Sequence, residues 1–138
     1  MVDSLIAGVS ETRKFLVSKE KTIGFMGEGA RVYATPSLVH DIEHTCRDLI
    51  AGLTEDGKDS VGFEVSVKHL APTLLNMEVS ITVTVAEVEG PKVVFDIAAQ
   101  DPVDLICKGR HTRFVVDVAQ TEERLKAKAE KVAGLSET

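Results

Sequence analysis

Three side chains suited to acid–base chemistry stand out in the sequence: Thr35, Glu43 and His69. Thr35 and Glu43 share a stretch, residues 33–51, whose apolar residues recur at helical spacing. With about 100° of turn per residue, Glu43 falls at the edge of the apolar arc and Thr35 at the helix entrance. A carboxylate half turned towards a core is costly unless it has a partner or a chemical role. We therefore take Glu43, below a hydroxyl at the positive end of a helix, as a candidate functional carboxylate.

His69 belongs to a different kind of element. Apolar and other residues alternate with period two over residues 61–70, and this pattern predicts a strand with one apolar face. Its apolar face carries Val61, Phe63, Val65 and Val67, and His69 falls on that same face. A histidine in this position is either a core residue with a satisfied hydrogen bond or an acid–base partner for a nearby group. The sequence alone leaves both interpretations open.

The helix that positions Thr35 and Glu43 has clear start and stop signals. Thr35 can cap its N-terminus, Pro36 suits the first helical position, and Gly52 offers a stop. These signals predict a helix over residues 36–51. Its polar arc should carry His40, Asp41, His44, Arg47 and Asp48.

The rest of the chain is predicted to be rich in strands. A weak strand is expected within residues 12–22, and long strands over residues 77–88, 92–99 and 105–118. Short turns between long strands predict an antiparallel meander, with the single apolar helix across the concave face of a curved sheet. This is an α+β fold. Residues 121–132 should form a charged helix docked through Leu125, Ala129 and Val132.

Length and composition limit the classes of protein. A chain of 138 residues suits one domain, residues 1–138, with a lead-in over 1–11 and a C-terminal helix and tail over 119–138. A net charge of −6 argues against a general nucleic-acid-binding protein. We see no signal peptide and no membrane span. Cys46 and Cys107 lie far apart and are expected to be free thiols in a reducing compartment, by default the cytoplasm.

Several short motifs lie at fixed distances from one another along the chain, and these distances together form a pattern. Val-Tyr-Ala-Thr at 32–35 is followed eight positions later by Glu43, and Gly62 precedes His69 by seven residues. His69 comes just before Ala-Pro-Thr at 71–73, and Gly-Arg-His-Thr-Arg occupies 109–113. In this joint spacing and in the order of its elements, the chain resembles the hotdog-fold acyl-CoA thioesterases of the fluoroacetyl-CoA thioesterase type. The resemblance covers about residues 12–118.

The resemblance implies hydrolysis of an acyl-CoA thioester. Thr35 and the helix N-terminus would then bind the carbonyl, and His69 would be the acid–base partner. Glu43 would act as a base on water or as a nucleophile that forms a mixed anhydride. Gly62 and Arg113 would bind substrate. Coenzyme A enters as part of the substrate, and no other cofactor and no metal is implied.

The resemblance also implies an assembly. Hotdog proteins pair as dimers with sites at the interface, so we expect a homodimer or higher homo-oligomer that binds acyl-CoA, without nucleic acid or membrane. Whether His69 meets Glu43 within one subunit or across two stays open. One departure stands out, because residues 22–35 are short and glycine-rich where the fluoroacetyl-specialised enzyme has a longer stretch with aromatic lid residues. This departure argues against fluoroacetyl-CoA and leaves the acyl group open.

Zinc chemistry is one competing interpretation. Residues 40–44 fit the H-x-x-E-H pattern, in which His40, Glu43 and His44 would serve a zinc-dependent hydrolase. Both histidines fall on the polar arc, however, and no second helix supplies a third ligand. A non-catalytic acyl-CoA-binding module and a hydratase or dehydratase on the same fold also compete with a thioesterase.

Overall fold

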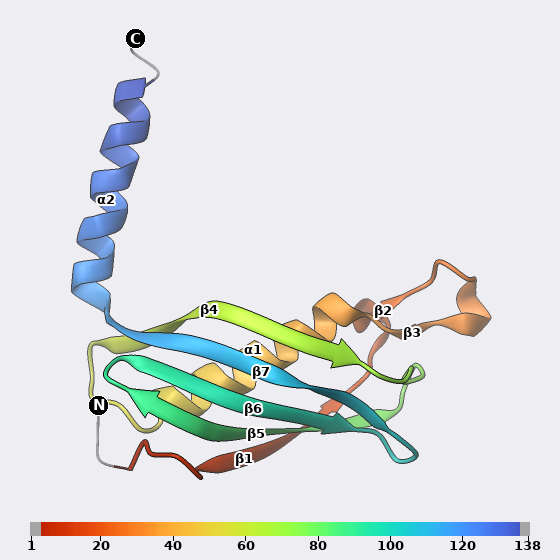
Figure 1. Cartoon of the computed structure of the whole chain (residues 1–138). Helices are drawn as coiled ribbons and strands as arrows, with labels where there is room; N and C mark the ends of the chain where they lie inside the picture. Colours follow the sequence, from red (N-terminus) through yellow and green to blue (C-terminus); the bar gives the residue numbers. More distant parts are fainter. Residues whose placement is uncertain (1–3, 136–138) are drawn as a thin grey trace.

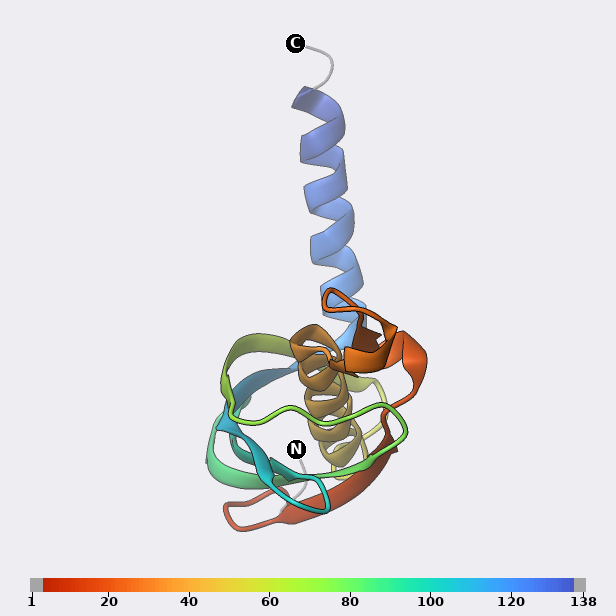
Figure 2. The same cartoon turned by 90° about the vertical axis from the view of Figure 1, so that its right-hand side faces the viewer.

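The structure is a computed structural model that describes residues 4–135. Its main elements are β1 (Ser10–Leu16), β2 (Thr22–Ile23), β3 (Val32–Tyr33), α1 (Thr35–Ala51), β4 (Lys58–His69), β5 (Glu78–Glu89), β6 (Lys92–Gln100), β7 (Leu105–Asp117) and α2 (Val118–Leu135). Short 3-10 turns occupy Lys19–Lys21 and Glu28–Ala30. The predicted α+β fold is confirmed: α1 lies along the concave face of a curved antiparallel sheet (Figures 1 and 2).

The five-stranded sheet has the order β1-β5-β6-β7-β4. The expected simple meander is therefore correct only for β5, β6 and β7. β4 pairs with β7 and forms the sheet edge opposite β1, so β4 and β5 do not form a hairpin. Because β5 is paired on both sides, by β1 and β6, residues 70–77 must carry the chain across the end of the sheet. That distance is three strand spacings, about 15 Å.

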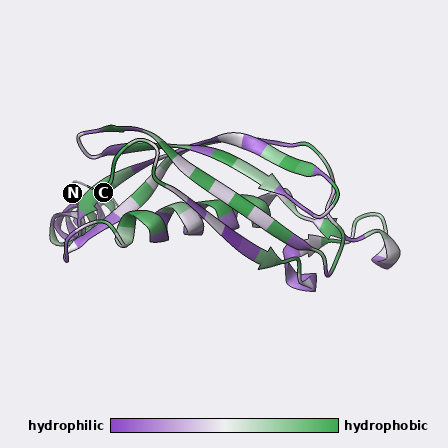
Figure 3. Cartoon of the chain, turned by 90° about the horizontal axis from the view of Figure 1, so that it is seen from below, coloured by the Kyte–Doolittle hydropathy of each residue, from purple (hydrophilic) through white to green (hydrophobic). Residues whose placement is uncertain are grey.

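The core lies between α1 and the concave face of the sheet. The helical spacing predicted from the sequence is confirmed, because Leu38, Ile42, Cys46 and Ile50 are all fully buried. They pack in one cluster with inward side chains of the strands, which alternate with polar residues most regularly along β5 (Figure 3). Each buried aliphatic side chain contributes about 1.5–3 kcal/mol, so this cluster fixes where α1 lies on the sheet.

The polar arc of α1 differs from the prediction at Asp41, which is 3% exposed. The short β2–β3 hairpin folds over the start of α1 and covers this position. The Tyr33 hydroxyl and the Lys21 ammonium group both donate hydrogen bonds to the Asp41 carboxylate. Burial and this carboxylate raise the pKa of Tyr33 far above its ordinary value. The carboxylate is buried at low cost because it is paired.

The face pattern predicted for β4 is wrong at its first half. The pairing with β7 shifts between Gly62 and Glu64, so Phe63 is an extra residue in a β-bulge. One inserted residue turns every side chain before it to the other face. Val61 and Phe63 therefore lie on the outer, convex face and are exposed, while Gly62 faces α1.

α2 also departs from the prediction. It leaves the end of β7 and extends away from the sheet, past the edge formed by β4 (Figures 1 and 2). None of its described residues is buried. Leu125 and Val132 are 61% and 57% exposed, so neither docks the helix onto its own chain. No helix within residues 4–135 is long and apolar enough to cross a membrane.

Candidate active site

The start of α1 brings two of the predicted residues together. Thr35 is the first helical residue and Ala34 the N-cap, so the prediction that Thr35 caps the helix is wrong. Its hydroxyl instead lies 2.8 Å from Nδ1 of His69, at the end of β4. We call Thr35 and His69 the helix-start pair. The edge of the His69 ring meets the Tyr33 ring, with centroids 6.4 Å apart, which limits the orientations open to the imidazole.

The chemistry of His69 follows from its surroundings. Burial lowers its pKa below the ordinary value of 6.5, so the ring is neutral at pH 7. Its Nε2 is buried and has no hydrogen-bond partner among residues 4–135. With the proton on Nδ1 donated to Thr35, this Nε2 offers a lone pair. With the proton on Nε2, it offers a donor. The helix-start pair thus has one unused position for proton transfer.

A pocket of about 300 Å³ opens beside this pair. It is lined by Ile23, Val32, Tyr33, Thr35, His69, Leu70, Ala71 and Pro72. The walls are mainly apolar, and the polar groups are the helix-start pair. The first N–H groups of α1 have no partner within the helix, so the helix start adds donors and a positive dipole end near Thr35. This combination suits a polarised carbonyl oxygen.

Glu43 belongs to a second group further along α1. Its Oε1 lies 3.9 Å from Nη1 of Arg113 and 3.9 Å from Nε2 of His111, and its side chain is 39% exposed. We call Glu43, Gly62, His111 and Arg113 the carboxylate cluster. Arg113 is 5% exposed, so it is a buried residue of β7 and not a surface charge. Its guanidinium group donates to the hydroxyl and the carbonyl oxygen of Ser60, which fixes it below Glu43.

The proton of His111 can be placed from its contacts. Nδ1 lies 2.9 Å from the carbonyl oxygen of Glu64, which only accepts, so Nδ1 carries the hydrogen. Nε2 then accepts from Arg113 at 3.3 Å. Burial lowers the pKa of His111, and the nearby Arg113 lowers it further. His111 is therefore a neutral support for Arg113, and the charge that faces Glu43 is that of Arg113.

Gly62 explains how the carboxylate reaches the sheet. A Cβ added at this position would lie 2.6 Å from Oε1 of Glu43, closer than real Cβ contacts. Glycine is therefore required for the close approach of the Glu43 side chain to β4. Its predicted role in binding substrate stays a prediction, as does that of Arg113.

The predicted site residues thus form two groups within one chain. The structure joins Thr35 to His69, and Glu43 to Gly62 and Arg113. Thr35 and Glu43 are eight residues apart on α1, which corresponds to about 12 Å along the helix axis. Glu43 cannot contact the atoms held by the helix-start pair of its own chain.

The H-x-x-E-H pattern does not converge on one point. The rings of His40 and His44 lie against each other, with centroids 4.2 Å apart, and both residues are exposed. Glu43 points instead towards β4 and β7. Within residues 4–135, no group of three His, Cys, Asp or Glu side chains is placed to hold a metal ion.

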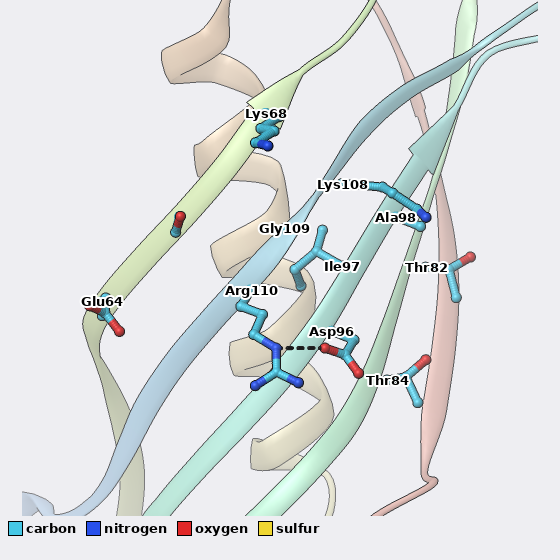
Figure 4. Close-up of a pocket in the computed structure, with 11 residues that line it drawn as sticks. Glu64, Lys68, Thr82, Thr84, Asp96, Ile97, Ala98, Lys108, Gly109 and Arg110 are labelled. Atoms are coloured by element: carbon cyan, nitrogen blue, oxygen red, sulfur yellow. Dashed lines mark ion pairs between the residues drawn. The ribbon is translucent and has the colours of Figure 1, made fainter.

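A larger groove of about 740 Å³ lies on the convex face of the sheet (Figure 4). Its polar lining residues include Glu64, Lys68 and Lys108, and Arg110 pairs with Asp96 at 3.0 Å. Threonine and serine hydroxyls complete its polar lining. None of the predicted site residues lines this groove. The candidate site is therefore on the concave side of the sheet.

Comparisons with known proteins define the class of this fold and site. The structure superposes on the fluoroacetyl-CoA thioesterase FlK with a TM-score of 0.83 and 28% identity, covering 91% of this chain and 98% of FlK. It superposes on a thioesterase superfamily member from Thermus thermophilus with a TM-score of 0.84 and 27% identity, covering 93% and 96%. The chain therefore has the hotdog fold of thioesterases, as the resemblance predicted.

The family follows from the sequence comparison. The family described as fluoroacetyl-CoA-specific thioesterase matches residues 17–119, and the chain belongs to this family of thioester hydrolases. A curated relative, the fluoroacetyl-CoA thioesterase of Streptantibioticus cattleyicolor, is 29% identical over 135 residues. The match covers 93% of this chain and 97% of the relative.

Sequence reasoning missed two supporting residues of the carboxylate cluster. His111 stands out in the sequence only as part of the segment 109–113, and Ser60 does not stand out at all. The signal for His111 is its spacing, because positions 111 and 113 of one strand must share a face. Ser60 gives no signal, since its contact with Arg113 depends on the pairing of β4 with β7.

Proposed function

We propose that the protein hydrolyses an acyl-CoA thioester to a free acid and coenzyme A, at a site completed by two copies of the chain. One observation carries this proposal. The helix-start pair and the carboxylate cluster lie two helical turns apart in one chain, and both reach the edge strand β4, at His69 and at Gly62. A second copy paired through β4 would bring one chain's Glu43 to the other chain's His69.

The edge strand β4 supports such a pairing. β4 is twelve residues long and forms one edge of the described sheet. Phe63 on this strand is 69% exposed, and Val61 and Val65 are also exposed. A long apolar edge strand presents unpaired backbone groups that readily pair with another strand. An antiparallel pair of two β4 strands would satisfy these groups and extend the sheet into the second copy.

The charges on β4 favour one register. With the two-fold axis at Ser66, Glu64 lies opposite Lys68 of the partner subunit, and both side chains are on the convex face (Figure 4). Opposite charges across a strand pair are favourable, whereas axes at Glu64 or Lys68 would oppose like charges. The same register, with the bulge at Phe63, sets Gly62 opposite His69 of the partner subunit on the concave face.

The combined site would supply each group that thioester hydrolysis needs. Thr35 and the start of α1 would hold the carbonyl oxygen, which becomes negative as the carbonyl carbon is attacked. Glu43 of the partner subunit would take a proton from water as the water oxygen bonds to that carbon. The C–S bond then breaks, and the thiolate of coenzyme A takes a proton from His69 or from Glu43. Alternatively, the carboxylate attacks directly and water hydrolyses the resulting mixed anhydride.

The acyl group is set by the segment before α1. In this chain the β2–β3 connection is short, and Phe25 in this connection is 90% exposed instead of covering the pocket. The pocket beside the helix-start pair is therefore bounded by Leu70, Ala71 and Pro72 and not by aromatic residues at the tip of its own hairpin. We propose an acyl-CoA other than fluoroacetyl-CoA as the preferred substrate, to be found by a screen of short, branched and aryl acyl-CoA esters.

Subunit complementation tests both the reaction and the shared site. Glu43→Ala and His69→Ala chains are purified separately and then refolded together, and thiol release from acyl-CoA is measured. Each variant alone should be inactive. The mixture should regain about a quarter of the wild-type activity, because half of randomly paired dimers are heterodimers with one intact site.

Two results would overturn the proposal. If the wild type binds acyl-CoA esters without releasing thiol, the protein is a binding module. If it releases thiol but the mixture stays inactive although heterodimers form, the site lies within one subunit. Wild-type chains unfolded and refolded in the same way control for losses during refolding.

A further inference from the structure

α2 is the least supported element of the chain. It has 18 residues and none of those described is buried, yet it carries an apolar stripe. Leu125, Ala129 and Val132 follow one another at spacings of four and three, which places them on one helix face. Isolated helices of this length are marginal in water without packing. The stripe therefore calls for a surface that its own chain does not provide.

A second exposed apolar surface lies at the opposite end of the sheet. The connections β4–β5 and β6–β7 meet there, far from α2 (Figure 1). We call their apolar side chains the far rim: Leu70, Leu74, Val103 and Leu105. All four are exposed, Val103 the most at 77%. Exposed apolar side chains gathered at one end of a sheet are typical of a protein–protein contact.

The two-fold axis proposed at Ser66 would bring these surfaces together. In an antiparallel β4–β4 pair, the end of one sheet lies beside the opposite end of the other. α2 extends past β4, towards the space that the second copy would fill (Figures 1 and 2). Its length is about 27 Å, and a five-stranded sheet is about 19 Å wide, so the helix can cross the whole far rim.

Charge complementarity supports the same contact. Arg124, Lys128 and Lys131 lie along one side of the apolar stripe of α2, at about 100° per residue. The far rim carries Asp104, exposed between Val103 and Leu105. Two α2 helices packed antiparallel on each other would instead set their basic sides together. A basic flank beside the exposed Asp104 carboxylate favours the far rim as the surface that α2 contacts.

We propose that α2 of one subunit docks across the far rim of the second subunit and closes the end of that subunit's pocket. This rests on the dimer of the proposed function. Leu70 belongs both to the far rim and to the lining of the pocket beside the helix-start pair. The docked helix would therefore form the outer wall for the acyl group. Each active site would then use three parts of two chains: a helix start, a partner carboxylate and a partner α2.

Disulfide trapping tests the contact. Cys46 and Cys107 are buried, so exposed introduced thiols react selectively. Chains with Leu125→Cys combined with Val103→Cys, or with Leu74→Cys, should form covalent dimers under mild oxidation. Within one subunit, residue 125 and the rim positions lie at opposite ends of the sheet, so a disulfide between them must join two subunits. The matched control is Ala127→Cys, on the opposite face of α2, with the same rim substitutions, and it should remain largely uncrosslinked.

The outcomes separate this contact from the proposed function. If Leu125→Cys alone crosslinks to itself, α2 pairs with α2 and the proposal is overturned. Equal crosslinking of the Ala127→Cys control, or none in any pair, overturns it as well, while a dimeric and active wild type keeps the proposed function. A monomeric wild type overturns both.

A substitution provides the functional test. Leu125→Glu should leave the dimer intact by sedimentation, because β4 pairs the subunits, and should raise KM for longer acyl-CoA esters about threefold or more. Ala127→Glu should leave KM unchanged. Equal KM values for both variants would show that α2 does not form a wall of the pocket.

Discussion

The two halves of the site are built in different ways. In the carboxylate cluster, Arg113 and His111 are buried and each is held by a backbone carbonyl of the neighbouring strand β4. In the helix-start pair, Thr35 is exposed and the two residues share one hydrogen bond, while Nε2 of His69 has no partner in the described part of the chain. His111 and Arg113 are thus fixed within one subunit, whereas the helix-start pair keeps one ring nitrogen whose hydrogen bond is not made within residues 4–135.

Because of this difference, the carboxylate cluster and the helix-start pair should respond differently to substitution. A group fixed by a strand ladder loses its geometry only when the ladder or a close contact is altered, whereas the half-buried helix-start pair depends on a single hydrogen bond and on what binds beside it. Substitutions in the two halves should therefore differ in size and in kind. The largest effect is expected at Glu43.

Glu43→Gln should lower kcat/KM for acyl-CoA hydrolysis by about 10³-fold, since an amide can neither accept the proton nor attack the carbonyl. The side chain is isosteric and 39% exposed but faces the buried Arg113 charge, so the free energy of unfolding should fall by at most about 1 kcal/mol. Thiol release and urea unfolding measure the two quantities. A variant that keeps more than a tenth of the activity would remove Glu43 from the mechanism.

Gly62→Ala should lower kcat/KM by about 10²-fold, because the added Cβ displaces the Glu43 carboxylate. A displacement of a catalytic group by about 1 Å can reduce the rate by this factor. The contact of 2.6 Å leaves no room for a methyl group. Gly29→Ala is the matched control, since no atom lies within 4 Å of its added Cβ. Similar activity in both variants would contradict a rigid carboxylate cluster.

Thr35→Val should lower kcat/KM about tenfold, and Thr35→Ser should retain most of the activity. Valine keeps the shape and removes the hydroxyl that lies 2.8 Å from His69, whereas serine keeps the hydroxyl. The effect is smaller than at Glu43 because the N–H groups of α1 still face the carbonyl. Steady-state kinetics of the two variants side by side measure it. Equal loss in both would assign Thr35 to packing.

The smallest effect concerns pH and stability. Burial lowers the pKa of His69 below 6.5, so the unfolded chain takes up a proton near pH 6.5 that the folded chain does not. The free energy of unfolding should therefore fall as pH decreases below about 6.5. In His69→Asn this decrease should be smaller, as measured by urea unfolding at neutral and mildly acidic pH. His44→Gln, at an exposed position of α1, is the control and should keep the wild-type slope.

Regular periodicity predicted much of the fold. The apolar spacing of α1 placed Leu38, Ile42 and Cys46 in the core, and Glu43 at its border, as the structure has them. The long strands were predicted within one to three residues of their ends. These features depend on neighbours in sequence, so the sequence pattern is sufficient to find them.

Features that depend on distant neighbours could not be predicted. Asp41 looks like a surface residue in a helical wheel, and it is buried because the β2–β3 hairpin brings Tyr33 and Lys21 over it. The bulge at Phe63 is hidden in the sequence of β4. The apolar residues before and after it alternate as if they all lay on one face of the strand. The separation of Thr35 and His69 from Glu43 also required coordinates, because the spacing of the motifs predicts a set of site residues and does not say how far apart they lie in one chain.

The extra residue in β4 has a consequence for comparing and redesigning relatives. Gly62 and His69 stand seven positions apart, an odd number, yet both look towards α1, because Phe63 adds one step to the strand. A homologue that lacks this single insertion would turn one of the two away, even if every functional residue type were present. Deleting Phe63 should thus abolish the site more thoroughly than changing its side chain. When relatives are compared, the number of residues between these two positions along the edge strand should therefore be counted as well as the motifs matched.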